Sequence, residues 1–174
     1  MRKIMIGDLP PAPWRNGGGV TREIALSTDE RGMIWRLSVA DVDADGPFSL
    51  FPGMMRVLTV IEGAGLMLDC PGGVISAPPA RPVRFPGGVS VRCRLAGGPV
   101  RDFNLIYDPA RAAMDVIRLE GGAYDIAGVG VLPLRGDVEI GGFGRAAPGS
   151  FVLFETNDAQ RLSVDGAALA VSRA

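Results

Sequence analysis

Short apolar segments separated by glycine and proline recur along the whole chain. Many of them alternate apolar and polar residues, as half-buried strands do. The expected strands are 20–26, 34–42, 56–61, 65–68, 82–85, 89–95, 101–107, 114–119, 129–134, 138–140, 151–154, 161–164 and 167–171. Helical periodicity is weak, and the best candidate is a turn or two over 109–114. Short strands with regular turns predict an all-β sandwich or barrel.

The strand pattern occurs twice. Residues 58–106 and residues 131–171 follow the same order of elements. This order is a strand, a glycine turn, a strand, a strand marked by proline and glycine, a further strand and a closing strand. This order resembles the small β-barrel of the cupin superfamily. We therefore expect a bicupin-like chain of two small packed barrels. Residues 1–108 would form the half with a pocket, and residues 109–174 a mainly structural half with few polar groups at inward positions.

Composition limits the partners. The chain has 174 residues, of which 47% are hydrophobic and 21% charged, and its net charge is −1. The 18 basic and 19 acidic residues are interspersed, so no basic run would neutralise a nucleic-acid backbone. No apolar run approaches the roughly 20 residues that span a bilayer, and no signal peptide is visible. We expect a cytoplasmic protein without a nucleic-acid or membrane partner.

The absence of histidine limits the chemistry. With 0 His, the chain has neither a Ser–His nor a Cys–His nucleophilic pair and no histidine metal centre. Cys70 and Cys93 have no CxxC spacing and are expected to be ordinary thiols. The sequence therefore predicts a protein without metal or other cofactor.

A triple glycine follows an aromatic, a basic and an amide residue in Trp14-Arg15-Asn16-Gly17-Gly18-Gly19. Glycines permit positive φ angles and let the backbone approach another group closely. Two interpretations stay open at this point. The segment is either a hinge that feeds a strand, or one wall of a site in which Trp14 packs the loop and the backbone passes close to a ligand.

Strand alternation sorts the next polar residues by face. Thr21 and Glu23 share a face opposite Arg22, whereas Arg36 and Ser38 share a face opposite apolar neighbours. An arginine and a serine on one face could line a polar pocket. They could equally form the solvated face of an edge strand.

The loop at 45–56 is bracketed by Gly-Pro and Pro-Gly turns and contains Phe51. Ser49 offers a hydroxyl group, and the planar guanidinium of Arg56 suits bidentate binding of a carboxylate. The alternative is a packed aromatic loop in which Arg56 pairs with Glu62 or Asp69.

Asp102 and Asn104 share one face of a further strand, opposite Phe103 and Leu105. Asp and Asn are poor strand residues, so two on one face suggest a hydrogen-bonding role. That role could be to fasten a neighbouring loop or to contact a ligand.

These clusters, in this order, resemble the HutD/Ves family of the cupin superfamily. The resemblance rests on segments 14–24, 35–40, 46–49 and 51–53, on Arg56 and Glu62-Gly63, and on 102–104. It implies a dimer with a pocket in the first half that binds a small acidic metabolite, such as formylglutamate or urocanate, and that acts in or modulates histidine catabolism. The expected ligand-binding residues are Trp14, Asn16, Arg22, Glu23, Arg36, Ser38, Ser49, Phe51, Arg56 and Asn104.

Three functions follow from these features. The first is a metal-free binding protein that senses or buffers a pathway intermediate, with no catalytic residue assigned. The second is an isomerase or hydrolase that uses Glu23 or Asp102 as its base, which requires burial to raise the pKa. The third is an interaction module with its arginines exposed and no enclosed pocket.

Overall fold

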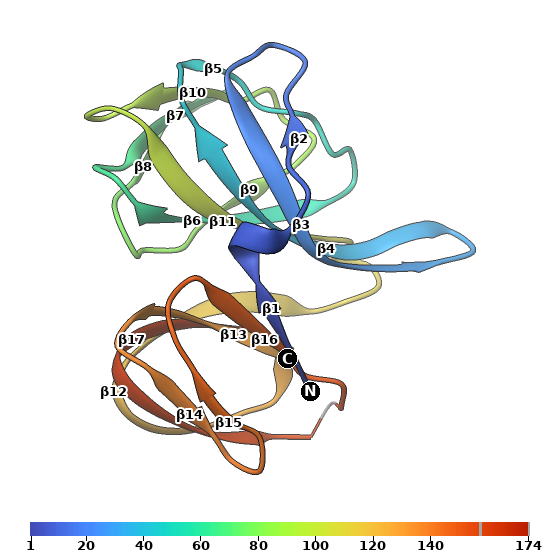
Figure 1. The fold of residues 1–174 in the computed structure, drawn as a ribbon. Helices are drawn as coiled ribbons and strands as arrows, with labels where there is room; N and C mark the ends of the chain where they lie inside the picture. Colours follow the sequence, from blue (N-terminus) through green and yellow to red (C-terminus); the bar gives the residue numbers. More distant parts are fainter. Residues whose placement is uncertain (157, 174) are drawn as a thin grey trace. The chain divides into compact units, whose positions relative to one another are not determined.

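The computed structural model describes residues 1–156 and 158–173. Their regular structure consists of strands β1 to β17 and one short 3-10 helix, η1, at Ile6–Asp8 (Figure 1). The all-β prediction is confirmed. The turn or two predicted over 109–114 is a single turn, which Asp108 begins by accepting hydrogen bonds from the Ala110 amide at 2.9 Å and the Ala112 amide at 3.0 Å, and no helix is assigned there.

The chain divides into two compact units, which we call the first unit (Pro10–Ala112) and the second unit (Met1–Leu9 with Ala113–Ala174). These bounds differ from the expected halves of 1–108 and 109–174. The difference at the N-terminus has a clear cause, because β1 (Arg2–Met5) pairs with β16 (Ser150–Leu153) rather than with any strand of the first unit.

The first unit contains two antiparallel sheets that form a nearly closed barrel (Figure 1). In spatial order, the six-stranded sheet contains β2 (Ala12–Pro13), β3 (Gly19–Asp29), β4 (Gly32–Val42), β11 (Val100–Tyr107), β6 (Met55–Glu62) and β9 (Val83–Pro86). The four-stranded sheet contains β5 (Gly46–Pro47), β10 (Arg92–Leu95), β7 (Leu66–Cys70) and β8 (Gly73–Ala77).

The core of the first unit joins these two sheets. Leu58 and Phe85 from the larger sheet belong to the same buried cluster as Leu68 and Cys93 from the smaller one. All four are inward-facing members of short strands, as period-2 alternation requires. Beyond this core, the ends of β3 and β4 extend away from the barrel as a two-stranded hairpin (Figure 1).

The second unit is a seven-stranded sheet with a separate apolar core that includes Val131, Leu162 and Phe154. Its strands besides β1 and β16 are β12 (Met114–Ile126), β13 (Gly128–Arg135), β14 (Val138–Ile140), β15 (Gly144–Ala146) and β17 (Gln160–Arg173). The finer expectation, that this unit is a second cupin barrel, stays a prediction.

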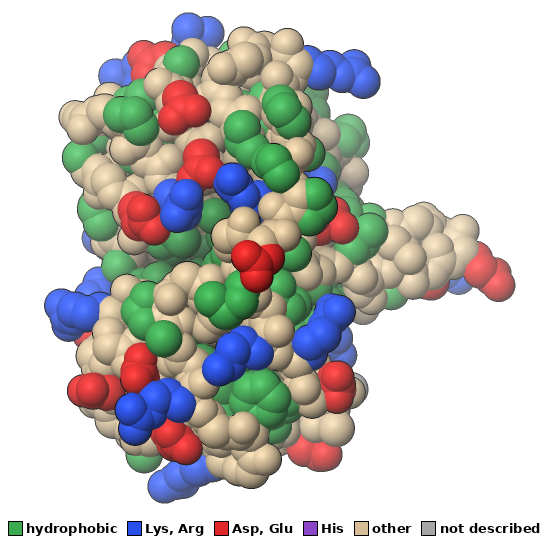
Figure 2. All heavy atoms as spheres, in the orientation of Figure 1, with side chains coloured by type: hydrophobic (Ala, Val, Ile, Leu, Met, Phe, Trp, Pro, Cys, Tyr) green, Lys and Arg blue, Asp and Glu red, His purple; other side chains and the backbone are tan. Residues whose placement is uncertain are grey.

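The surface reflects the balanced composition. Acidic and basic side chains are interspersed on the face shown in Figure 2. Among the residues that the structure describes, no helix has the length and apolar character needed to cross a membrane.

Candidate functional site

A cavity of about 770 Å³ lies within the first unit, against one face of its six-stranded sheet. We call this the cavity face. Its walls come from β3, β4, β6 and β11, from the segment 10–16 and from the loop after β5. The cavity is therefore built entirely from residues of one compact unit.

Strand register places the polar residues of the cavity face in rows. Glu23 on β3 pairs with Ser38 on β4, and Ser38 pairs with Asn104 on β11. In the adjacent row, Ile106 on β11 lies between Arg36 and Arg56. Directly paired residues of an antiparallel sheet point to the same side, so both rows face the cavity.

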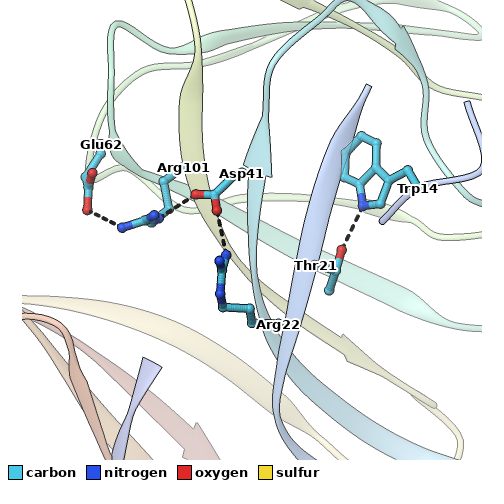
Figure 3. A network of polar contacts seen from close by, with 6 residues as sticks. All are labelled: Trp14, Thr21, Arg22, Asp41, Glu62 and Arg101. Atoms are coloured by element: carbon cyan, nitrogen blue, oxygen red, sulfur yellow. Dashed lines mark hydrogen bonds and ion pairs between the residues drawn. The ribbon is translucent and has the colours of Figure 1, made fainter. Parts of the chain in front are cut away.

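The Trp14 segment forms one rim of the cavity. The Trp14 ring nitrogen Nε1 donates a hydrogen bond to Thr21 Oγ1 at 2.8 Å (Figure 3). The Trp14 ring also meets the Phe48 ring edge-on, with centroids 6.1 Å apart. Trp14 therefore fastens the segment both to β3 and to the loop after β5, leaving Arg15 and Asn16 at the cavity wall.

The triple glycine makes the turn that carries this rim, and it does not line the cavity. Gly17 has φ +71°, and the Gly18 amide donates to Asn16 Oδ1 at 3.0 Å. A Cβ atom on Gly19 would lie 2.4 Å from the backbone oxygen of Asp41. The expectation that the glycine backbone passes close to a ligand is thus corrected, because the close approach is to β4.

Arg56 is the most deeply buried cation of the site, with 6% of its surface exposed. Its Nε donates to Asn104 Oδ1 at 2.9 Å, and its guanidinium lies 4.3 Å from the centroid of the Phe48 ring. Burial lowers the pKa of Arg56 to about 10, while the nearby Asp102 opposes that shift. No group among the described residues accepts a hydrogen bond from its two terminal nitrogens, which leaves them available to the cavity.

Asp102 lies behind Asn104 and is fully buried. Asn104 donates through Nδ2 to Asp102 Oδ1 and accepts from Arg56 through Oδ1, so its amide links the carboxyl group to the cation. Burial raises the pKa of Asp102 to about 6, although Arg56 and the Asn104 hydrogen bond favour the ionised form. Asp102 Oδ2 has no hydrogen-bond partner in the part of the chain that the structure describes.

Arg36 provides a second cation on the same face. Its guanidinium lies 5.4 Å from the centroid of the Phe51 ring. Its Nε is buried and has no hydrogen-bond partner among the described residues. A buried donor without a partner is costly, and a ligand atom could satisfy it.

The opposite face of the sheet carries arginines of another kind. Arg22 Nη1 lies 2.6 Å from Asp41 Oδ2, and Arg101 Nε lies 2.6 Å from Asp41 Oδ1 (Figure 3). Arg101 also pairs with Glu62 at 3.1 Å. These guanidinium groups are held by carboxylates of the protein itself.

All expected ligand-binding residues except Arg22 line the cavity. Arg22 is placed on the opposite face by the same alternation that places Glu23 toward the cavity. The sequence expectation omitted Arg15, Thr21, Ile106 and the segment 10–13, which also line it. For Thr21 the signal was present, because it shares a face with Glu23.

The alternative partners for Arg56 are excluded by the geometry. Glu62 pairs with Arg101, and Asp69 pairs with Arg94 at 2.7 Å. The burial of Arg56 does not fit an arrangement in which all the arginines lie exposed on strand faces.

No group of three or more Cys, Asp or Glu side chains among the described residues is arranged to hold a metal ion. The expectation of a metal-free protein stays a prediction.

A family model described as HutD matches residues 7–171. The chain belongs to the HutD family. HutD from Pseudomonas fluorescens SBW25 has a similar structure, with 31% identity, a TM-score of 0.88, and coverage of 99% of this chain and 98% of that one. A conserved protein of unknown function from Pseudomonas aeruginosa PAO1 is similar at 32% identity, with a TM-score of 0.84 and coverage of 99% and 97%.

A Pseudomonas putida protein, named as an uncharacterized protein in the hutC 3′ region, is 44% identical over 112 residues. The match covers 60% of this chain and 56% of that relative, so this chain matches little more than half of its length. The link between HutD and histidine utilisation rests on this naming by gene neighbourhood. A cupin 2 barrel protein from Leptotrichia buccalis shares the fold at 8% identity, with a TM-score of 0.66 and coverage of 99% and 96%.

Proposed function

We propose that this HutD-family protein binds a small carboxylate metabolite in the first-unit cavity and thereby senses or modulates histidine catabolism. The observation that carries the proposal is Arg56, a buried cation whose terminal nitrogens have no protein acceptor among the described residues. A guanidinium group with two free N–H groups matches a carboxylate in a bidentate arrangement.

The rest of the cavity supports an anionic ligand. Its lining contains three arginines, Arg15, Arg36 and Arg56, against one carboxylate, Glu23. Its volume of about 770 Å³ falls within the roughly 300–1,000 Å³ of small-ligand pockets. Phe48 and Phe51 supply apolar walls, so a ligand with a carboxylate and a short organic body fits the chemistry.

Formylglutamate and urocanate fit this description, and both belong to the pathway for which the family is named. The carboxylates of formylglutamate could bind the arginines, and its amide N–H could donate a hydrogen bond to the carboxylate of Glu23. The similar HutD structure from P. fluorescens is described in a formate condition, and formate is the simplest carboxylate probe of the same site.

The proposal is tested by calorimetric titration of the protein with formylglutamate, urocanate, glutamate and formate. We expect Arg56→Met to weaken binding of the tightest of these ligands roughly 10- to 100-fold, the value of charge-assisted hydrogen bonds. The matched control is Arg22→Met, which removes a paired arginine from the opposite face and is expected to leave the affinity within about twofold.

Two outcomes would overturn the proposal. One is that none of the four carboxylates binds at millimolar concentration. The other is that both variants weaken binding equally while thermal unfolding shows both to be folded. Product formation from these metabolites that is lost in Glu23→Gln would favour the isomerase or hydrolase instead.

A further inference from the structure

We propose that Asp102 takes up a proton when an anion binds at Arg56, so that the cavity accepts its ligand as an anion together with one proton. This inference rests on the proposed function and adds a regulatory property to the same site. It makes Asp102 a positioning residue, since Asp102 does not itself line the cavity.

The geometry connects Asp102 to the anion site in two steps. Arg56 donates to Asn104, and Asn104 donates to Asp102. Asp102 is 0% exposed, so no water shell stabilises its carboxylate. One of its oxygens accepts from Asn104 and the other, Oδ2, has no partner among the described residues. Its ionised form therefore depends on one amide hydrogen bond and on the charge of Arg56.

An anion at the terminal nitrogens of Arg56 changes that balance. It brings a second negative charge to a buried cation whose largest favourable electrostatic interaction is with Asp102. Two like charges around one cation in a poorly hydrated site repel each other, and protonation of one of them relieves the repulsion. The proton comes from solvent and adds to Asp102 Oδ2, and no bond of the ligand forms or breaks.

The other charged or titratable groups near Asp102 are not expected to take up this proton in its place. Asp41, on β4, already disfavours the charged form of Asp102. Cys93, on β10, is buried, and burial raises its pKa, so it stays a neutral thiol. In the cavity, Arg36 is a second cation whose charge lowers the pKa of Arg56, and Glu23 lines the same wall as Ser38. Asp102 is thus the group near Arg56 that can take up a proton around neutral pH, since burial already raises its pKa to about 6.

The sign of the expected effect follows from linkage. A ligand that raises the pKa of Asp102 binds more tightly at low pH, where the proton is already in place. Its affinity falls as the pH rises from about 6 through the higher pKa of the complex. A rise of one unit in that pKa corresponds to a roughly tenfold loss of affinity across the window.

Calorimetric titration with formylglutamate between about pH 5.5 and about pH 8.5 tests the inference, because its carboxylates stay ionised throughout this range. In wild type we expect roughly tenfold tighter binding at the acid end. Repeating the titration near neutral pH in two buffers with different ionisation enthalpies should show net proton uptake. Asp102→Asn, a neutral variant of the same shape, should bind with the acid-end affinity at every pH and take up no proton.

The matched control is Asp69→Asn. Asp69 is a carboxylate of the other sheet, paired with Arg94 at the surface, so this variant should keep the wild-type pH profile. A residue needed only to support the fold would instead weaken binding at every pH when replaced. Tighter binding at the alkaline end in Asp102→Asn separates the two roles.

A flat pH profile in wild type, without proton uptake, would overturn the inference while leaving the proposed function in place. Because proton uptake is measured on wild type, this test stands even if Asp102→Asn fails to fold. If wild type binds no carboxylate at any pH, the proposed function itself fails.

Discussion

The arginines on the two faces of the β3–β4–β11–β6 sheet differ in their partners. On the cavity face, Arg36 and Arg56 stack near aromatic rings, and no carboxylate forms an ion pair with them among the described residues. On the opposite face, Arg22 and Arg101 share the carboxylate of Asp41 (Figure 3). A buried arginine that forms no direct ion pair is costly to stability, whereas a paired one on a half-exposed face adds modestly to it. The contrast separates arginines without an ion-pair partner among the described residues from arginines paired with carboxylates of the protein itself.

The largest effect is expected from a substitution that separates β3 from β4, because these strands supply residues to both faces of the sheet. In Gly19→Ala the new Cβ would lie 2.4 Å from the Asp41 oxygen. We expect the free energy of unfolding to fall by roughly 3 kcal/mol, with ligand affinity lost as well. Urea denaturation measures the first effect and calorimetry the second.

Gly17→Ala is the control for that change. Gly17 has open space around it but φ +71°, so only backbone strain opposes a side chain. Its cost should be about 1 kcal/mol. Equal costs at both positions would show that contact with β4 is not what requires Gly19.

Asp41→Asn tests the opposite face alone. The hydrogen bonds from Arg101 and Arg22 hold the pKa of Asp41 below its ordinary value of 3.8, against the opposing effect of burial. A lowered pKa stabilises the fold above about pH 4, and that contribution is lost as the pH falls through the folded-state value. We expect a loss of roughly 1 to 2 kcal/mol at neutral pH in urea denaturation, since Asp41 is partly screened by solvent.

The same variant should approach wild-type stability in acid, as the pH falls through the lowered folded-state pKa of Asp41 and the native carboxylate takes up its proton. It should keep its ligand affinity at neutral pH within about twofold. A large loss of affinity would show that the two faces are coupled.

Arg36→Met sharpens the contrast from the cavity side. Removing the guanidinium group relieves the cost of the partnerless Nε but loses the contact with Phe51, and because these effects oppose each other the free energy of unfolding should change by less than about 0.5 kcal/mol. Carboxylate affinity should fall roughly tenfold, which calorimetry resolves. A marked loss of stability with unchanged affinity would place Arg36 among the structural arginines.

Trp14→Phe is expected to have the smallest effect. The variant loses the hydrogen bond from Nε1 to Thr21 but can keep an aromatic contact with Phe48. We expect a loss of roughly 0.5 to 1 kcal/mol in urea denaturation and a modest loss of affinity through a looser rim. Unchanged stability would mean that the turn at Gly17 and Gly19 is enough to hold segment 10–16 in place without the Trp14 hydrogen bond.

Local alternation sufficed to predict much of the cavity face. Arg36 with Ser38, and Asp102 with Asn104, lie on common faces as the period of a strand dictates. The same rule places Arg22 and Glu23 on opposite faces, whereas the family segment favours both as ligand-binding residues. Here the physical rule was a better guide than the resemblance.

Other features depend on contacts that no local pattern records. Whether a polar strand face is solvated or enclosed depends on what covers it, here the segment 10–16 and the loop around Ser49 and Phe51. The burial of Asp102 and the partnerless Arg36 Nε likewise depend on tertiary packing. The pairing of β1 with β16 joins residues from opposite ends of the sequence, which turn chemistry cannot specify.

That pairing also bears on how the chain folds during synthesis. The first unit is an insertion between the two parts of the second, because Leu9 and Ala113 belong to one body. A chain emerging from the ribosome can complete the whole cavity once Ala112 is free, since domains fold as units from the N-terminal side. Strand β1, made first, must wait for Ser150–Leu153 before it finds its partner. The cavity would thus be assembled before the unit into which it is inserted is complete.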